Sequence, residues 1–155
     1  SIRITANDPA SIILDTAGDK KLCLFNAFPR QSILEECNVV RQCLKDNHEY
    51  QCNRYKGEPT LDQLIHYYGD KSFNDNKLFA MTFFAYHRSV SHLMHEWFIE
   101  NVRWSIQDQI SFPYVLSASG LNYSLFEGRV DDNNSLFEWD WKHRERSLSY
   151  SLPSN

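Results

Sequence analysis

Two adjacent polar residues, Asp108 and Gln109, separate two apolar segments of the chain. In front of them, apolar side chains recur at the spacing of one helix face, which predicts a helix over about residues 89–103. A second apolar run, residues 110–116, follows at once. A carboxylate held between two buried segments has a fixed position, and acid–base chemistry requires fixed positions. We therefore take Asp108 and Gln109 as candidate catalytic residues.

A carboxylate in this place can orient or deprotonate a hydroxyl group, or stabilise positive charge in a transition state. The structural alternative is that Asp108 only begins a helical turn and that Gln109 faces water. A third possibility pairs Asp108 with Glu96 or Glu100 as the two carboxylates of a hydrolase. The separation of those carboxyl groups does not follow from their sequence positions.

Four further residues are candidates for binding a substrate. His87 and Arg88 follow a predicted buried strand over residues 78–86, and ligands of α/β folds bind outside the carboxyl ends of strands. Asn76 ends a polar loop and can hydrogen-bond hydroxyl groups, unless it is an ordinary turn residue. Arg30 can reach a phosphate or pair with a neighbouring glutamate.

Two other histidines, His92 and His95, are three positions apart and share a helix face. Their order differs from the H-E-x-x-H pattern in which two histidines bind zinc around a catalytic glutamate. We interpret them as surface or partly buried side chains.

Length and composition limit the classes of protein that the chain fits. Its 155 residues suit one domain, and the 42% of apolar and 14% of aromatic residues suit a packed core. The net charge of −4, without a dense basic block, argues against nucleic-acid binding. The four cysteines contain no C-x-x-C pair, which favours reduced thiols in a cytosolic protein over a zinc site or disulfides. No segment is long and apolar enough to span a membrane, and no signal-peptide pattern is present.

The expected secondary structure alternates between strands and helices. Asp8 and Ser32 stand where helix N-caps belong, and Glu35 follows Ser32 at capping-box spacing. We therefore expect an α/β domain over residues 1–146, with a mainly parallel sheet flanked by helices, and a flexible tail over residues 147–155. Strands are expected near residues 1–5, 21–25, 78–86, 123–126 and 136–141, and helices near 8–16, 32–45, 48–55, 61–68 and 89–103.

Several of these segments resemble one family. They are FPR at residues 28–30, the His87-Arg88 pair after an apolar strand, the helix that follows it, and above all DQISFPYV at residues 108–115. Together they resemble a glycosyltransferase-like family of bacterial surface-polysaccharide loci and of plant mucilage- and wall-related transferases, similar in pattern to GT-A nucleotide-sugar transferases. The family usually has a histidine where this chain has Phe28.

The resemblance implies transfer of a sugar from a nucleoside-diphosphate donor to a glycan acceptor with a divalent metal, Mn²⁺ or Mg²⁺. It implies that His143 is a metal ligand and that an Asp-x-Asp-like strand precedes Ser1, so that the chain is a C-terminal portion of a GT-A domain. It also implies that the protein acts in the cytoplasm or at the cytoplasmic face of the membrane. The main alternative is a non-catalytic glycan-binding or assembly module with the same fold.

Overall fold

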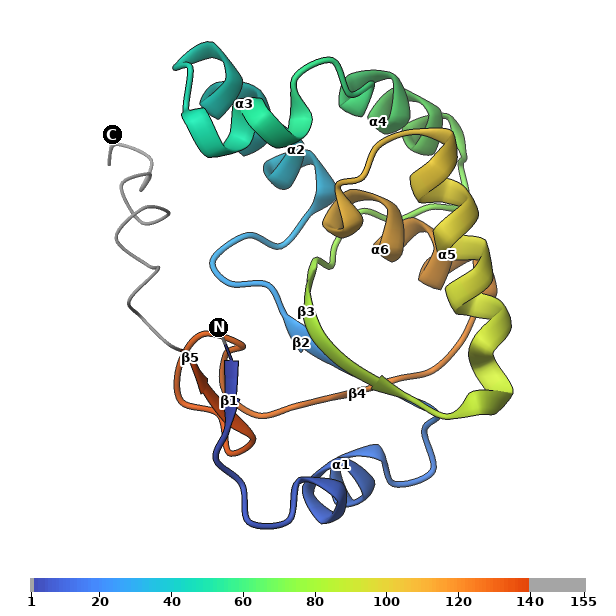
Figure 1. The fold of residues 1–155 in the computed structure, drawn as a ribbon. Helices are drawn as coiled ribbons and strands as arrows, with labels where there is room; N and C mark the ends of the chain where they lie inside the picture. Colours follow the sequence, from blue (N-terminus) through green and yellow to red (C-terminus); the bar gives the residue numbers. More distant parts are fainter. Residues whose placement is uncertain (1, 140–155) are drawn as a thin grey trace.

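The computed structural model describes residues 2–139, with a three-stranded sheet at its centre (Figure 1). Strand β2 (Leu22–Asn26) lies between β3 (Phe79–Tyr86) and β4 (Ser124–Leu125). It runs antiparallel to β3 and parallel to β4. A second sheet pairs β1 (Ile2–Ile4) with β5 (Phe137–Trp139) in antiparallel orientation. The fold is therefore mixed α/β.

Helices connect the strands of the described part of the chain. They are α1 (Pro9–Ala17), α2 (Ile33–Lys45), α3 (Glu49–Tyr55), α4 (Thr60–Gly69), the 3-10 turn η1 (Arg88–Val90), α5 (Ser91–Arg103) and α6 (Asp108–Ser119). No described helix has the length and apolarity that crossing a bilayer requires. The expected limit at residue 146, the tail 147–155 and His143 lie outside the described residues.

Local capping explains where the first helices begin. The carboxylate of Asp8 accepts a hydrogen bond from the backbone N–H of Ser11 at 3.0 Å, and the hydroxyl of Ser32 accepts one from Glu35 N–H at 3.1 Å. Each bond satisfies an N–H group that has no partner within its helix. The Glu35 carboxylate accepts from Gln31 N–H at 2.7 Å, one residue earlier than a capping box would place it. Both predicted helix starts are confirmed.

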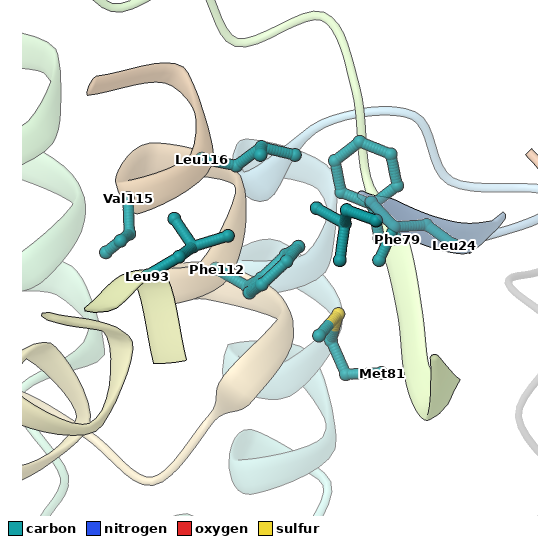
Figure 2. Close-up of a cluster of buried hydrophobic side chains, with 8 residues drawn as sticks. Leu24, Phe79, Met81, Leu93, Phe112, Val115 and Leu116 are labelled. Atoms are coloured by element: carbon teal, nitrogen blue, oxygen red, sulfur yellow. The ribbon is translucent and has the colours of Figure 1, made fainter. Parts of the chain in front are cut away.

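The side chains of β2 alternate between two faces of the sheet, and both faces are buried. Leu22 and Leu24 point toward helices α5 and α6. Figure 2 shows the strand residues on one side of this cluster and the helix residues, among them Leu93 and Phe112, on the other. On the opposite face, Phe25 stacks on Phe126 with ring centroids 4.8 Å apart, beneath α1 and the β1–β5 pair. A strand covered on both faces explains the continuous apolar run of β2.

A third apolar cluster lies beyond the Asn26 end of β2, where α2, α4 and α6 meet. Ile33 of α2, Tyr67 of α4 and Ile110 of α6 are fully buried there. These helices therefore form a rigid layer around the end of β2 from which the chain leaves the sheet.

The mainly parallel sheet expected from the sequence is not seen within the described residues. The chain leaves β2 at Asn26, passes through α2, α3 and α4, and returns to the same end of the strand, where Ala27 N–H bonds Leu78 O at 2.9 Å. Strand β3 therefore begins beside the end of β2 and must run antiparallel to it. A single crossover helix would have carried the chain back to the start of β2 instead.

Candidate functional site

Asp108 is the first residue of α6, so Asp108 and Gln109 belong to the first turn of a helix that was not expected from the sequence. Its side chain is half-buried, and no residue in the range 2–139 forms an ion pair with it within 4.0 Å. Burial raises the pKa of this carboxyl, while backbone N–H groups at the helix start and the charge of Arg54 oppose the rise. A carboxyl with a raised pKa is better suited to take up a proton near neutral pH.

Gln107, the residue before α6, fixes the position of Asp108 relative to two other helices. Its Nε2 donates to the Glu36 carboxylate of α2 at 2.7 Å, and its Oε1 accepts from the Tyr55 hydroxyl of α3 at 3.0 Å. Burial raises the pKa of Tyr55 to about 12, so this hydroxyl stays protonated and keeps donating. The start of α6 is therefore held at a junction of three helices.

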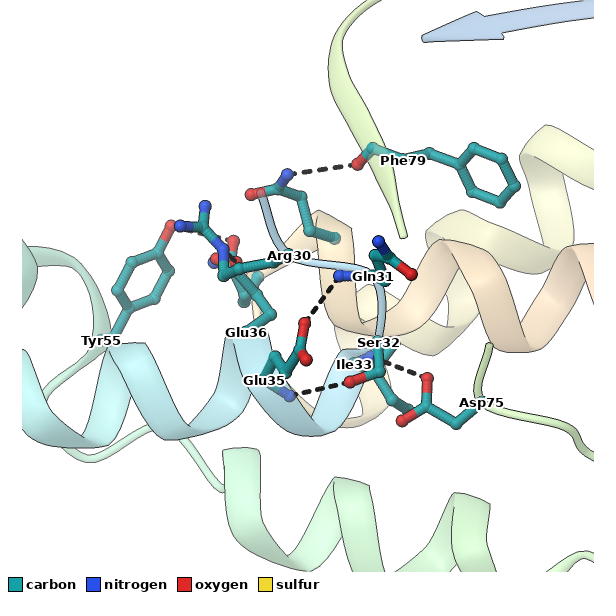
Figure 3. Close-up of polar contacts among 11 residues, drawn as sticks. Arg30, Gln31, Ser32, Ile33, Glu35, Glu36, Tyr55, Asp75 and Phe79 are labelled. Carbon is teal, nitrogen blue, oxygen red and sulfur yellow. Dashed lines mark hydrogen bonds and ion pairs between the residues drawn. The ribbon is translucent and has the colours of Figure 1, made fainter. Parts of the chain in front are cut away.

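Glu36 is only 4% exposed and is the second carboxylate at this junction. Its other oxygen accepts from Arg30 Nε at 2.5 Å, and Figure 3 shows Arg30, Glu36 and Tyr55 pointing toward one another. Burial raises the pKa of Glu36, the Arg30 charge opposes the rise, and the nearby charge of Asp108 adds to it. The two carboxyl groups are thus close enough to affect one another electrostatically.

A second arginine, Arg54, completes the junction. Its guanidinium lies 5.3 Å from the ring centroid of Tyr50 and 5.2 Å from that of Tyr55, which is cation–π geometry. Two carboxyls, two arginines, a phenol and an amide thus meet where three helices converge. We call this group the Asp108 cluster; it consists of Arg30, Glu36, Arg54, Tyr55, Gln107 and Asp108.

A cavity of about 360 Å³ opens next to the cluster. Arg30 belongs to both, because it bonds Glu36 and also lines the cavity together with Asn26 and Asn76. Asp108 is not among the lining residues. The structure thus brings the predicted residues Arg30 and Asn76 to one cavity, with Asp108 linked to it through the Arg30–Glu36 pair.

Gln109 has a structural contact that the sequence did not suggest. Its Nε2 donates to the backbone oxygen of Phe79 at 3.1 Å, which ties the first turn of α6 to the first residue of β3. The side chain is half-buried. Its remaining amide oxygen is the group available to a substrate.

His87 and Arg88 lie at the opposite end of the sheet from Asn76 and Arg30. His87 N–H bonds Lys21 O at 2.8 Å, beside the start of β2, because β3 runs antiparallel to β2. Both side chains are exposed, and the His87 ring accepts a hydrogen bond from Ser89 N–H at 3.2 Å, which caps the turn η1. The pair therefore lies at the other end of β3 from Phe79, whose backbone oxygen accepts from Gln109.

Two adjacent polar residues of the loop before β3, Asp75 and Asn76, have different contacts. Asp75 turns inward and accepts from the N–H groups of Ile33 and Leu34 at 2.7 and 3.1 Å, so it caps α2. Asn76 is exposed and lines the cavity. The sequence by itself does not show which of these two adjacent residues faces α2.

The predicted hydrolase pairs receive no support from the contacts of their glutamates. Glu100 is buried and accepts from the Tyr67 hydroxyl at 2.9 Å and from Arg103 at 3.0 Å, and Glu96 is exposed. The carboxylate that interacts with Asp108 is Glu36, which sequence reasoning missed. A signal for it exists, since Glu36 occupies a position on the apolar face of α2 between Ile33 and Val40.

The predicted metal site cannot be assembled from the described residues alone. Within residues 2–139, no group of three or more His, Cys, Asp or Glu side chains is arranged to hold a metal ion. His143 lies outside that range.

No protein-family model matches the chain, and searches of curated proteins and of solved structures give no match either.

Proposed function

We propose that this chain is part of a GT-A-type glycosyltransferase that moves a sugar from a nucleoside-diphosphate donor to a glycan acceptor. The supporting observation is the Asp108 carboxyl: half-buried, without an ion-pair partner among the described residues, and with a raised pKa. A carboxyl of this kind suits a general base, because it is held rigidly and can accept a proton from a hydroxyl group.

In this proposal the residues around Asp108 have separate roles. Asp108 accepts the proton of the acceptor hydroxyl, and the oxygen of Gln109 helps to orient that hydroxyl. Gln107 and Glu36 are positioning residues, since they act through the helix start and not on the substrate. Arg30 and Asn76 contact the substrate in the adjoining cavity.

The divalent metal of the proposal, Mn²⁺ or Mg²⁺, requires ligands beyond residues 2–139. His143 is the candidate that the sequence offers. When bound, such an ion stabilises the negative charge of a departing diphosphate. We place the reaction in the cytoplasm or at the cytoplasmic face of the membrane, where nucleotide sugars would be supplied.

The test is turnover by the purified protein with Mn²⁺, a panel of nucleoside-diphosphate sugars and glycan acceptors. Release of the nucleoside diphosphate and mass spectrometry of the glycan report the reaction. Asp108→Asn should lower the rate at least about a hundredfold, the usual scale for losing a positioned acid–base group. The matched control is Asp62→Asn, which removes an exposed acid from the first turn of α4. Equal rates in the two variants would remove Asp108 from the mechanism.

A non-catalytic glycan-binding module is the second candidate. The cavity favours it, because amide side chains such as Asn26, Gln31 and Asn76 bind hydroxyl groups without needing a catalytic base. Binding of a glycan without turnover of any nucleotide sugar would select this candidate over the transferase.

A further inference from the structure

Two cavities adjoin one another at the Asn26 end of the sheet. One, of about 360 Å³, lies between the segment after β2 and the start of β4, and the other, of about 310 Å³, lies between the loop before β3 and the end of α6. Asn76, Lys77 and Tyr123 line both. We call the combined space the Lys77 groove. The two cavities can take two parts of one ligand, because they share these three lining residues.

The groove is lined by basic residues but by no acidic ones, although the whole chain is acidic. Arg30 and Lys77 line the first cavity, and no acidic residue lines either cavity. The chain has 20 acidic and 16 basic residues, so this segregation of charge is not a consequence of composition. The neighbouring acid Asp75 faces α2, where two backbone N–H groups occupy its carboxylate. The groove is therefore suited to an anionic group.

Both basic residues have donors left for a ligand. Arg30 uses its Nε for Glu36, which leaves the two terminal nitrogens of the guanidinium. Lys77 is exposed and forms no ion pair with any residue in the range 2–139; its Nζ lies 5.1 Å from the ring centroid of Tyr123. An arginine and a lysine on one cavity wall provide several N–H donors for a carboxylate or phosphate.

Part of the remaining lining, which also includes apolar side chains, suits a ligand with hydroxyl groups. Asn26, Gln31 and Asn76 contribute amide groups that can each donate and accept. Tyr123 is held edge-on against Phe79, with centroids 5.2 Å apart, and supplies a fixed aromatic surface between the two cavities. Amide groups beside a fixed aromatic ring are a general way to hold a sugar ring by hydrogen bonds and stacking.

We propose that the Lys77 groove binds a saccharide that carries a carboxylate or a phosphate. The anionic group lies between Arg30 and Lys77, and the sugar ring lies against Tyr123 and extends toward the end of α6. The saccharide part rests on the proposed function, whereas the preference for an anion rests on the groove lining alone. Asp108 itself lines neither of the two cavities.

The test is an NMR titration of the protein with glucuronic acid, glucose 1-phosphate, glucose and inorganic phosphate. At least one acidic sugar should shift the backbone amide signals of Asn76, Lys77 and Tyr123, and higher salt should weaken its binding. Which acidic sugar binds more tightly identifies the anion as carboxylate or phosphate. Glucose and inorganic phosphate should bind more weakly, because each provides only one of the two parts.

Two variants locate the binding. Lys77→Gln should weaken binding of the acidic sugar about tenfold, the scale of one partly exposed charge-assisted hydrogen bond. Lys71→Gln is the matched control, because it removes the same charge from an exposed lysine of the same loop that does not line the groove. Asn76→Ala should weaken the binding of glucuronic acid and of glucose 1-phosphate to the same extent.

Three results would overturn the proposal: glucose binding as tightly as the acidic sugars, inorganic phosphate binding as tightly as glucose 1-phosphate, or equal affinities in the Lys77 and Lys71 variants. These outcomes are independent of turnover. Binding of an acidic sugar without sugar transfer would support the Lys77 groove and contradict the transferase proposal. Sugar transfer without binding at Lys77 would support the transferase proposal and contradict the groove.

Discussion

The two ends of the β2–β3 pair both carry polar residues, but they differ in how these residues are held. At the Asn26 end, Glu36 and Gln107 are each 4% exposed and bond one another, next to Arg30 and Asp108. At the Lys21 end, His87 and Arg88 are exposed, and His87 serves to cap a turn. Polar side chains that are buried have lost water and must find partners, whereas exposed ones need none.

This difference indicates where function is to be sought. Three helices hold the polar residues of the Asn26 end in fixed positions, and a cavity adjoins them. The residues of the Lys21 end are turn residues on an open surface. Substitutions at the first end should therefore affect activity and stability together, while those at the second should affect neither strongly.

The largest effect on stability is expected for Glu36→Ala. The substitution leaves Arg30 without its carboxylate and removes the acceptor of the Gln107 amide in a buried place. Loss of a buried partner of this kind costs about 3 kcal/mol in the free energy of unfolding. Urea denaturation followed by circular dichroism measures it. Arg88→Ala, at the other end, should change the same quantity by less than about 0.5 kcal/mol; equal losses would contradict the comparison.

A smaller and opposite effect is expected for Asp108→Asn. Burial raises the folded-state pKa of Asp108, so the ionised carboxylate destabilises the native protein at neutral pH. Asparagine removes this cost, and the variant should gain about 1 kcal/mol at pH 7, a common gain for a stabilising substitution at a functional site.

The pH dependence of this gain identifies its cause. The native protein binds the proton of Asp108 more tightly than the unfolded chain, so wild-type stability falls as the pH rises through the folded pKa. The advantage of Asp108→Asn should be complete above that pKa and vanish below the ordinary aspartate value of about 3.9. Thermal melts from pH 3.5 to pH 8 measure it, and a constant difference would exclude ionisation as the cause.

The smallest effect is expected for His87→Ala. The His87 ring accepts one exposed hydrogen bond, from Ser89 N–H at the start of η1. Losing an exposed cap costs about 0.5 kcal/mol, near the lower limit for helix caps. Transferase activity should stay within about twofold of the wild type, since the residue lies away from the Asp108 cluster. A large loss of activity would move the site to the Lys21 end of the sheet.

The sequence was sufficient where a structure depends on residues close along the chain. The caps Asp8 and Ser32 bond residues three positions away, and both were predicted. The strand β3 and the helix α5 followed from an apolar run and from apolar periodicity, although only the first three residues of β3 are buried. The role of Asp108 stays a prediction; the structure shows only that its side chain is half-buried at the start of α6.

The tertiary structure decided which distant residues meet. Gln107 and Glu36 are 71 positions apart, and no local pattern indicates that they bond. No local pattern indicates the direction of β3 either, because that direction depends on where three helices return the chain to the sheet. The separation of His87 from Asn76 follows from this direction. Sequence alone thus determined the caps of α1 and α2, the strand β3 and the helix α5, but not the helix α6, because capping and apolar patterns are local. Only the packing of helices against the sheet decided the composition of the site, because contacts between distant segments depend on the path of the whole chain.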